Sequence, residues 1–217
     1  MPDTAVKESK ERVRTAIKNA GYDVPPRRIV VNLAPAYLRK EGPSFDLAIA
    51  IAILAVTEQL HCSQLDAYLL LGELSLDGSL RPVKGILPIS LEYCSTGYTM
   101  LVPAANQEES AIGGTVTYGF RHLRDVVHFL ENPQQYTPVQ VAPPVFSPSA
   151  QLYSQHDFAQ IRGQAEAKRA LEIAAAGNHN ILMVGSPGSG KTMLSQALPG
   201  ILPPLTLAES LSLSKIY

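Results

Sequence analysis

The sequence predicts an α/β protein in two parts, a mixed α/β domain over residues 1–132 and a shorter unit over residues 156–217. The length of 217 residues fits one or two domains, and a hydrophobic content of 46% excludes a chain that is disordered as a whole. Between the two parts, residues 133–155 are expected to form an extended, proline-rich linker. The prolines near its start are Pro133, Pro138, Pro143, Pro144 and Pro148.

The first helix is expected over residues 4–20, because Val13, Ile17 and Ala20 recur at helical spacing on one face among charged residues. Gly21 follows as a stop signal. A strand is expected over 28–33, followed by a buried helix over 45–60 with Ser44 as its N-cap. A hairpin is expected over 67–80, with its turn at Asp77-Gly78. The remaining expected elements are a helix over 84–96, a strand over 98–102, a helix over 105–111, a strand over 115–120 and a helix over 121–131.

The shorter unit is expected to begin with a helix over residues 164–176, which are rich in alanine and charged side chains and are followed by Gly177. Residues 180–184, with the sequence NILMV, are expected to form a short apolar strand. A second helix is expected to begin near Gly190. A strand, a glycine-rich segment and a helix therefore follow one another, which is the context that a phosphate-binding loop requires.

The glycine-rich segment, residues 185–192, has the sequence GSPGSGKT and fits G-x-x-x-x-G-K-[ST] at every position. Glycines allow the backbone to turn its amides inward around an anion, and Lys191 adds a positive charge for phosphate oxygens. The hydroxyl of Thr192 suits the Mg²⁺ ion that accompanies a nucleotide. The sequence therefore predicts ATP and Mg²⁺ as ligands. The predicted binding residues are Gly185, Ser186, Pro187, Gly188, Ser189, Gly190, Lys191 and Thr192, the last also touching the metal.

Charge and hydropathy indicate whether the protein is expected to contact nucleic acid or a membrane. A net charge of -1 and a pI of about 6.5 give no whole-chain attraction to nucleic acid or anionic lipid. The longest apolar run, residues 47–56, is half of the roughly 20 residues that a membrane helix needs, and the N-terminal segment is charged rather than signal-like. Cys62 and Cys94 are expected to be free thiols, buried or half-buried. We therefore expect a soluble, cytoplasmic protein without membrane contact.

Two local charge features allow more than one interpretation. Residues 7–28 hold seven basic and three acidic residues, which suits either a DNA-facing patch or a solvated helix face with pairs such as Glu8–Arg12. Asp46 lies inside an apolar helix and is expected to be a buried, hydrogen-bonded structural acid. The five histidines are scattered along the chain, so no metal site is expected from them.

The segment around the loop, HDFAQIRGQAEAKRALEIAAAGNHNILMVGSPGSGKT, resembles the opening of an AAA+ module of the magnesium-chelatase-like family, the ComM/YifB group. Upstream, PDTAVKESKERVRTAIKNAGY, RIVVNLAPAYLRKEGPSFDLAIAIAIL and GELSLDGSLRPVKGILPISL are similar to the N-terminal domain of that group. The resemblance implies a Lon-protease-like (ribosomal S-five-type) βα fold for residues 1–132 and the start of a P-loop AAA+ domain for residues 156–217. It also implies that Asp157, Phe158 and residues 161–164 border the adenine.

The same resemblance implies a role for a longer protein. Members of this family are ATPases that assemble into AAA+ rings, here a homo-oligomer, and the ComM branch is implicated in DNA branch migration during natural transformation. The family pattern extends before Met1 and beyond Tyr217, where the acidic strand, the sensor residues and the arginine finger would lie. This chain is therefore expected to be truncated at both ends. Whether it hydrolyses ATP alone is left open, and no catalytic residue is assigned.

Two other functions compete with nucleotide binding. One is a non-catalytic interaction or assembly module in which the truncated loop is inactive. The other is a Ser–Lys peptidase, because Gly42-Pro43-Ser44 resembles the Lon nucleophile segment. The family position of the base falls near Pro88, which cannot take a proton, while Lys84 lies four residues earlier. Ser44 is therefore expected to be a helix cap rather than a nucleophile.

Overall fold

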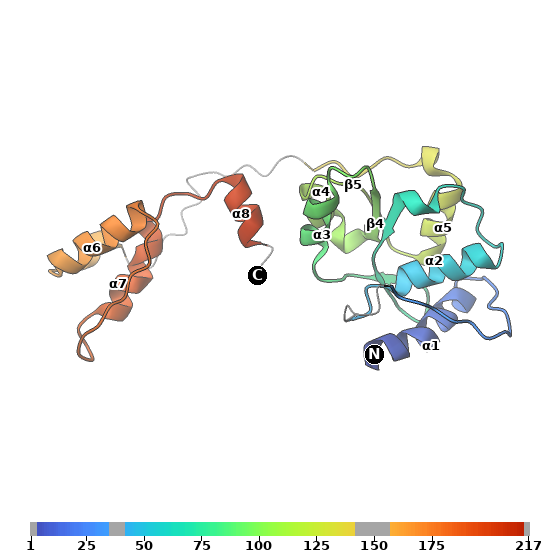
Figure 1. Cartoon of the computed structure of the whole chain (residues 1–217), viewed down its shortest axis with the longest axis horizontal. Helices are drawn as coiled ribbons and strands as arrows, with labels where there is room; N and C mark the ends of the chain where they lie inside the picture. The colour runs from blue at the N-terminus through green and yellow to red at the C-terminus, as the bar shows by residue number, and fades with distance from the viewer. Residues whose placement is uncertain (1–3, 35–41, 142–156, 215–217) are drawn as a thin grey trace. The chain divides into compact units, whose positions relative to one another are not determined.

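The computed structural model of the chain describes residues 4–34, 42–141 and 157–214 (Figure 1). The chain separates into two compact units, residues 1–143 and residues 144–217. Each unit has a hydrophobic core of its own.

The first unit has the predicted mixed α/β fold. Its main sheet has three parallel strands in the order β1-β4-β5, and β2 and β3 form a separate antiparallel pair. The elements are α1 (Thr4–Asn19), α2 (Asp46–Val56), η1 (Leu65–Ala67), β1 (Tyr68–Leu70), β2 (Glu73–Leu74), β3 (Leu80–Arg81), α3 (Ile86–Tyr93), β4 (Thr99–Pro103), η2 (Ala104–Asn106), α4 (Gln107–Ile112), β5 (Val116–Phe120), α5 (Leu123–Glu131) and η3 (Pro133–Gln135).

Helices cover both faces of the parallel sheet. Because successive side chains of a strand point to opposite faces, Met100 and Val102 of β4 pack with Ile86 of α3, whereas Leu101 joins the core that α1, α2 and α5 form. In Figure 1, α3 and α4 lie on one side of β4, and α2 and α5 lie on the other. The central strand is therefore buried from both sides, which explains its nearly continuous apolar sequence.

The helix α1 ends where the sequence predicts. Gly21 adopts the left-handed conformation with φ +88°, and its N–H donates to the carbonyl of Lys18 at 2.9 Å. The N–H of Tyr22 donates to the carbonyl of Ile17 at 3.1 Å. This pair of hydrogen bonds is the Schellman arrangement, which satisfies carbonyls that the helix end would otherwise leave unpaired.

The predicted hairpin forms with a shorter first arm. The turn at Asp77-Gly78 is confirmed, with φ +89° at Gly78 and Leu74 opposite Leu80 in the antiparallel pair. Residues 68–70, expected in the same hairpin, pair instead in parallel with β4. Leu69 packs on the α3 side of the sheet while its neighbours face the main core, so this segment gains apolar contacts on both faces beside β4.

Two local predictions in this unit are wrong. Residues 28–33 are not a strand, and Val30 is 76% exposed. Within the described residues no strand lies beside this segment, and a strand needs a hydrogen-bonded neighbour. The N-cap of α2 is Phe45 rather than Ser44, and no side chain caps it. The backbone carbonyl of Ser44 instead accepts a hydrogen bond from the N–H of Gly72 at 3.0 Å.

The start of the expected linker packs against the first unit. The ring of Tyr136 makes contacts with the rings of Phe120 and Phe129, at centroid distances of 6.0 and 5.3 Å. Farther along, the N–H of Val139 donates to the carbonyl of Thr117 in β5 at 2.8 Å. The later part of the expected linker, residues 142–155, lies outside the described residues.

The second unit is helical within its described residues. Its core consists of Ile161, Leu171, Leu194 and Ala197, and the predicted helix end at Gly177 is confirmed. The predicted strand over residues 180–184 is absent there, because the described residues offer it no neighbouring strand. Its elements are η4 (Phe158–Gln160), α6 (Ala165–Ala176), α7 (Lys191–Ala197), η5 (Leu198–Ile201) and α8 (Leu207–Leu213).

Candidate functional site

The glycine-rich loop of residues 185–192 runs directly into α7, which begins at Lys191. Gly188 and Gly190 have φ values of +81° and +87°, a region in which a Cβ atom is strained. A Cβ added at Gly188 would meet no atom within 4 Å. Glycine is therefore required at this position by the backbone conformation rather than by crowding.

The side chain of Lys191 folds back over the loop. Its ammonium group donates to the carbonyl oxygens of Gly185 and Ser186, both at 2.8 Å, and to the hydroxyl of Ser189 at 3.2 Å. The positive charge is therefore held within the curve of the loop. Thr192 is exposed in the first turn of α7, so its hydroxyl is accessible from solvent.

An open pocket of about 400 Å³, called the cavity below, adjoins the loop. It lies among the loop, α6 and the segment 181–184. The residues that line it are Gln164, Ala167, Ala170, Ile181, Leu182, Met183, Val184, Gly185, Ser186, Ser189, Lys191 and Leu194.

The residues that the resemblance assigns to the adenine are spread over different surroundings. Gln164 lines the cavity and donates from its side-chain amide to the carbonyl of Ser189 at 3.2 Å. Ile161 is buried in the core of the unit, and Phe158 packs against that core. Asp157 caps η4 by accepting a hydrogen bond from the N–H of Ala159 at 2.9 Å. Among these residues, Gln164 is the one that the structure brings to the cavity.

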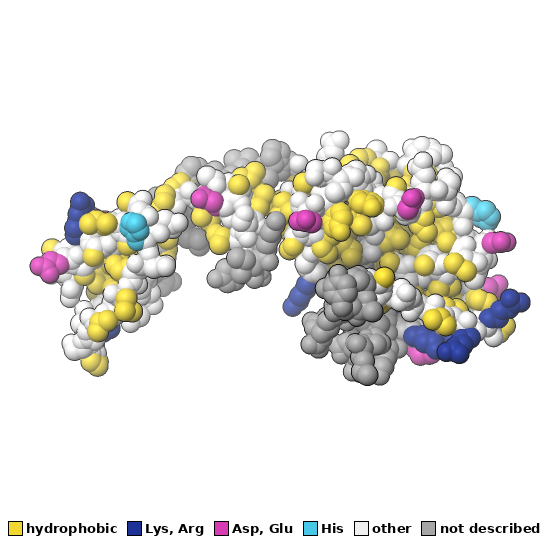
Figure 2. Space-filling model, in the orientation of Figure 1, with side chains coloured by type: hydrophobic (Ala, Val, Ile, Leu, Met, Phe, Trp, Pro, Cys, Tyr) yellow, Lys and Arg dark blue, Asp and Glu magenta, His cyan; other side chains and the backbone are white. Residues whose placement is uncertain are grey.

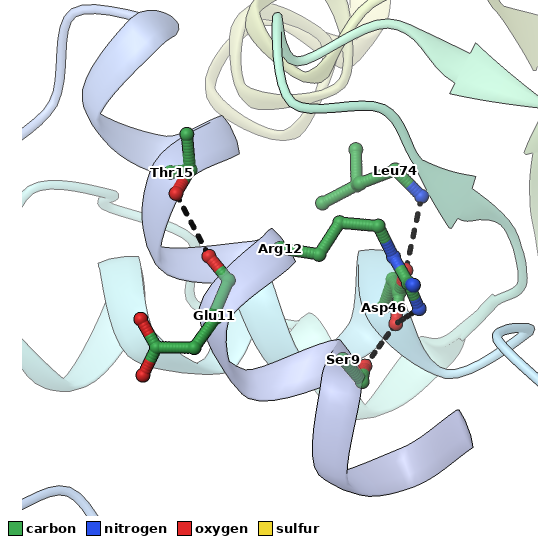
Figure 3. Close-up of polar contacts among 6 residues, drawn as sticks. All are labelled: Ser9, Glu11, Arg12, Thr15, Asp46 and Leu74. Carbon is green, nitrogen blue, oxygen red and sulfur yellow. Dashed lines mark hydrogen bonds and ion pairs between the residues drawn. The ribbon is translucent and has the colours of Figure 1, made fainter. Parts of the chain in front are cut away.

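In the first unit, Asp46 is the buried structural acid that the sequence predicts (Figure 3). Its carboxylate is fully buried and accepts hydrogen bonds from the Ser9 hydroxyl, from the Leu74 N–H at 3.2 Å and from the Arg12 guanidinium at 2.7 and 3.2 Å. One carboxylate therefore joins α1, α2 and β2. All its hydrogen bonds lie within the protein, which favours a structural role.

This ion pair changes the expected basic patch. The hydrogen bond with Asp46 raises the pKa of the Arg12 guanidinium above its usual value, and this ion pair engages the Arg12 charge with a buried acid. The partner of Arg12 is thus Asp46 on α2 rather than the expected Glu8 on the same helix. Figure 2 shows basic side chains gathered over α1 and the segment that follows it. The exposed basic residues of this part of the chain include Lys10, Lys18, Arg27 and Arg28.

Sequence reasoning missed the role of His122, which is the N-cap of α5. Its Nδ1 accepts the N–H of Arg124 at 3.1 Å, and its Nε2 lies 3.0 Å from the carbonyl of Asp77. Histidine is not among the preferred capping residues, so the sequence carries no signal for it. Cys62 is half-buried as expected, but Cys94 is exposed, because it follows the last turn of α3 at the surface.

Comparison with known proteins bears directly on this loop. A family model described as subunit ChlI of Mg-chelatase matches residues 1–106, and a second, magnesium chelatase subunit ChlI, matches residues 157–217. The second match contains the whole glycine-rich loop. This chain belongs to the magnesium-chelatase-like family of YifB and ComM. The expected family is thereby confirmed.

Individual relatives match the chain from end to end. YifB of Escherichia coli is 44% identical over 217 residues, which are 100% of this chain and 42% of YifB. Competence protein ComM of Haemophilus influenzae is 43% identical over 220 residues, again 100% of this chain and 43% of the relative. Protein Rv2897c of Mycobacterium tuberculosis is 40% identical over 219 residues, with 42% of its length covered. The chain therefore spans less than half the length of these relatives.

Among the helices of the described residues, none combines the length and the apolar character that crossing a membrane requires. Nor do the described residues bring three or more histidine, cysteine or acidic side chains together as a metal site.

Proposed function

We propose that residues 185–192 bind ATP together with Mg²⁺ and that this unit is the start of a P-loop AAA+ domain. The proposal rests on one observation above all: the complete motif forms a loop with left-handed glycines, a lysine ammonium inside its curve and a helix beginning at its end. The residue types fit the ligand. Backbone amides and Lys191 suit phosphate oxygens, and the exposed Thr192 hydroxyl suits Mg²⁺, which would neutralise phosphate charge when bound.

The cavity beside the loop supports a ligand larger than phosphate. Its lining is mixed: α6 and residues 181–184 contribute apolar side chains, and the loop contributes polar groups. A nucleotide has the same division, with a flat base at one end and anionic phosphates at the other. We therefore propose that the base occupies the apolar part of this cavity.

Calorimetric titration of the 217-residue chain with MgATP tests the proposal. Wild type is expected to bind, and Lys191→Ala to lose at least tenfold in affinity, since a charged hydrogen bond contributes about 1.5–3 kcal/mol. Arg169→Ala is the matched control, because it removes one positive charge from an exposed side chain of α6 in the same unit. Equal affinity of wild type and Lys191→Ala would reject the site.

For the whole protein we propose an ATP-driven AAA+ homo-oligomer that acts on DNA, with a Lon-type first domain. Family membership supports the ATPase, the name of the ComM relative supports a link to competence, and the exposed cations Lys10 and Lys18 on α1 support a DNA contact. The test is anisotropy of labelled duplex DNA at increasing salt. The double variant Lys10→Glu/Lys18→Glu is expected to weaken binding, whereas Lys84→Glu, an exposed change outside α1, is the control.

A second candidate is a non-catalytic assembly module. The observation that favours it is the exposure of Leu182 and Val184, at 86% and 87%, because apolar side chains beside an unpaired backbone segment are suited to contact with other protein. The same titration separates the two candidates. A flat MgATP titration of demonstrably folded protein would favour the assembly module.

A further inference from the structure

We propose that Gln164 is a positioning residue for the phosphate loop, in which it fixes the orientation of the Ser189–Gly190 peptide. This inference rests on the proposed binding of MgATP and adds to it a residue outside the motif. Gln164 lies 21 residues before the loop begins at Gly185, and the structure brings the two together.

The contact joins a side chain to the loop backbone. The amide nitrogen of Gln164, Nε2, donates to the carbonyl oxygen of Ser189 at 3.2 Å. In a planar trans peptide the C=O and N–H groups point in opposite directions. Fixing the Ser189 carbonyl toward Gln164 therefore turns the N–H of Gly190 the other way. Gly190 has φ +87°, and a glycine in this region can also rotate to other conformations at little cost, so an external hydrogen bond is useful here.

The backbone of Gln164 is itself held in an uncommon conformation. Its φ and ψ are 56° and 36°, a left-handed region that a glutamine rarely adopts. Its carbonyl begins α6 by accepting the N–H of Lys168 at 2.9 Å. A glycine or asparagine would adopt this backbone with less strain. A glutamine in this position therefore suggests that its side chain contributes something that the backbone alone does not require.

The segment before Gln164 is anchored to the same elements as the loop. Ile161 is 3% exposed and packs in one core with Leu194, which lies in the first turn of α7. The Lys168 ammonium donates to the carbonyl of Ile161. The first contact joins Ile161 to the start of α7, and the second joins it to α6. The amide of Gln164 therefore reaches the loop from a rigid support.

The test uses Gln164→Met, which keeps the length of the side chain and removes its hydrogen-bond donor without adding charge. In the 217-residue chain we expect MgATP affinity to fall about twofold to tenfold, the range for loss of one hydrogen bond. The matched control is Gln160→Met, an exposed glutamine on η4 that does not line the cavity, and its affinity is expected to equal that of wild type.

Two further measurements separate positioning from stability. Gln164→Gly relieves the left-handed strain and is expected to keep the melting temperature of wild type while losing the same affinity as Gln164→Met. The ¹H–¹⁵N resonance of the Gly190 amide is expected to shift in both variants and not in the control. If wild type binds MgATP and both variants bind equally well, or if the Gly190 resonance is unmoved, the positioning role is wrong. If wild type itself does not bind, the proposed function is what fails.

Discussion

Removing the buried carboxylate by Asp46→Ala should strongly destabilise the first unit. The substitution leaves the hydroxyl of Ser9, which is 3% exposed, and the N–H of the fully buried Leu74 without an acceptor. Each unsatisfied buried group costs about 1–3 kcal/mol. The side chain of Arg12 is 21% exposed and can turn to water, so its contribution should be small. We therefore expect a loss of about 3–5 kcal/mol in the free energy of unfolding, as for breaking other buried ion pairs.

Urea denaturation, followed by near-ultraviolet circular dichroism, measures this loss. Tyr68 and Tyr136 contact the ring of Phe129 inside the first unit, so their signal reports on that unit. Asp46→Asn keeps one carbonyl acceptor and should lose about 2 kcal/mol. The control Asp66→Asn changes an exposed aspartate and should stay within about 0.5 kcal/mol of wild type.

The reasoning would be refuted by an Asp46→Ala protein whose unfolding free energy lies within about 0.5 kcal/mol of wild type. A double-mutant cycle with Arg12→Ala then tests the ion pair itself. Because the two residues are in direct contact, the double variant should lose less than the sum of the single variants. Strict additivity would mean that the guanidinium and the carboxylate do not stabilise each other.

Three further predictions concern the turn beside α5 and the half-buried phenol of Tyr68. In chemical denaturation, Gly78→Ala should lower the free energy of unfolding by about 2–3 kcal/mol and Gly85→Ala by about 1 kcal/mol. Both glycines are left-handed, but a Cβ at Gly78 would also lie 2.9 Å from the hydrogen-bonded His122 ring. Equal losses in the two variants would contradict the steric contribution at Gly78. His122→Ala should lower the free energy of unfolding by about 1 kcal/mol because α5 loses its N-cap, and His122→Asn should keep most of that stability. An unchanged stability of His122→Ala would mean that the cap does not stabilise the protein. Burial raises the pKa of the Tyr68 phenol above 10.0, so folding stability should fall as the pH rises from about 10 through the folded value; ultraviolet titration should show one late-ionising tyrosine fewer in Tyr68→Phe.

The peptidase alternative gains no support from the first unit. Ser44 precedes Phe45, the N-cap of α2, and its backbone carbonyl accepts a hydrogen bond from the N–H of Gly72. Lys84 is exposed in the segment between β3 and α3, and Pro88 lies in the first turn of α3. The structure therefore shows a structural hydrogen bond at the Ser44 backbone, and the position expected for the base is occupied by Pro88, which cannot take a proton.

Much of the fold could be predicted from short segments of the sequence. The helix over residues 4–19, its end at Gly21 and the turn at Asp77-Gly78 depend on residues that lie within a few positions of one another. Their apolar spacing and glycine content are sufficient to specify them. The same holds for the loop of residues 185–192, whose left-handed glycines and following helix arise from eight consecutive residues.

The sequence by itself therefore determined the helices, the tight turns and the family, because each of these depends on residues that are close together in the chain. Tertiary structure alone decided which groups meet across long separations: Arg12 with Asp46, residues 68–70 with β4, and Gln164 with Ser189. The physical reason is that strands, buried charges and side-chain amides are satisfied by partners elsewhere in the chain. A segment such as 180–184, which has strand-like residues and no neighbouring strand among the described residues, remains exposed for the same reason.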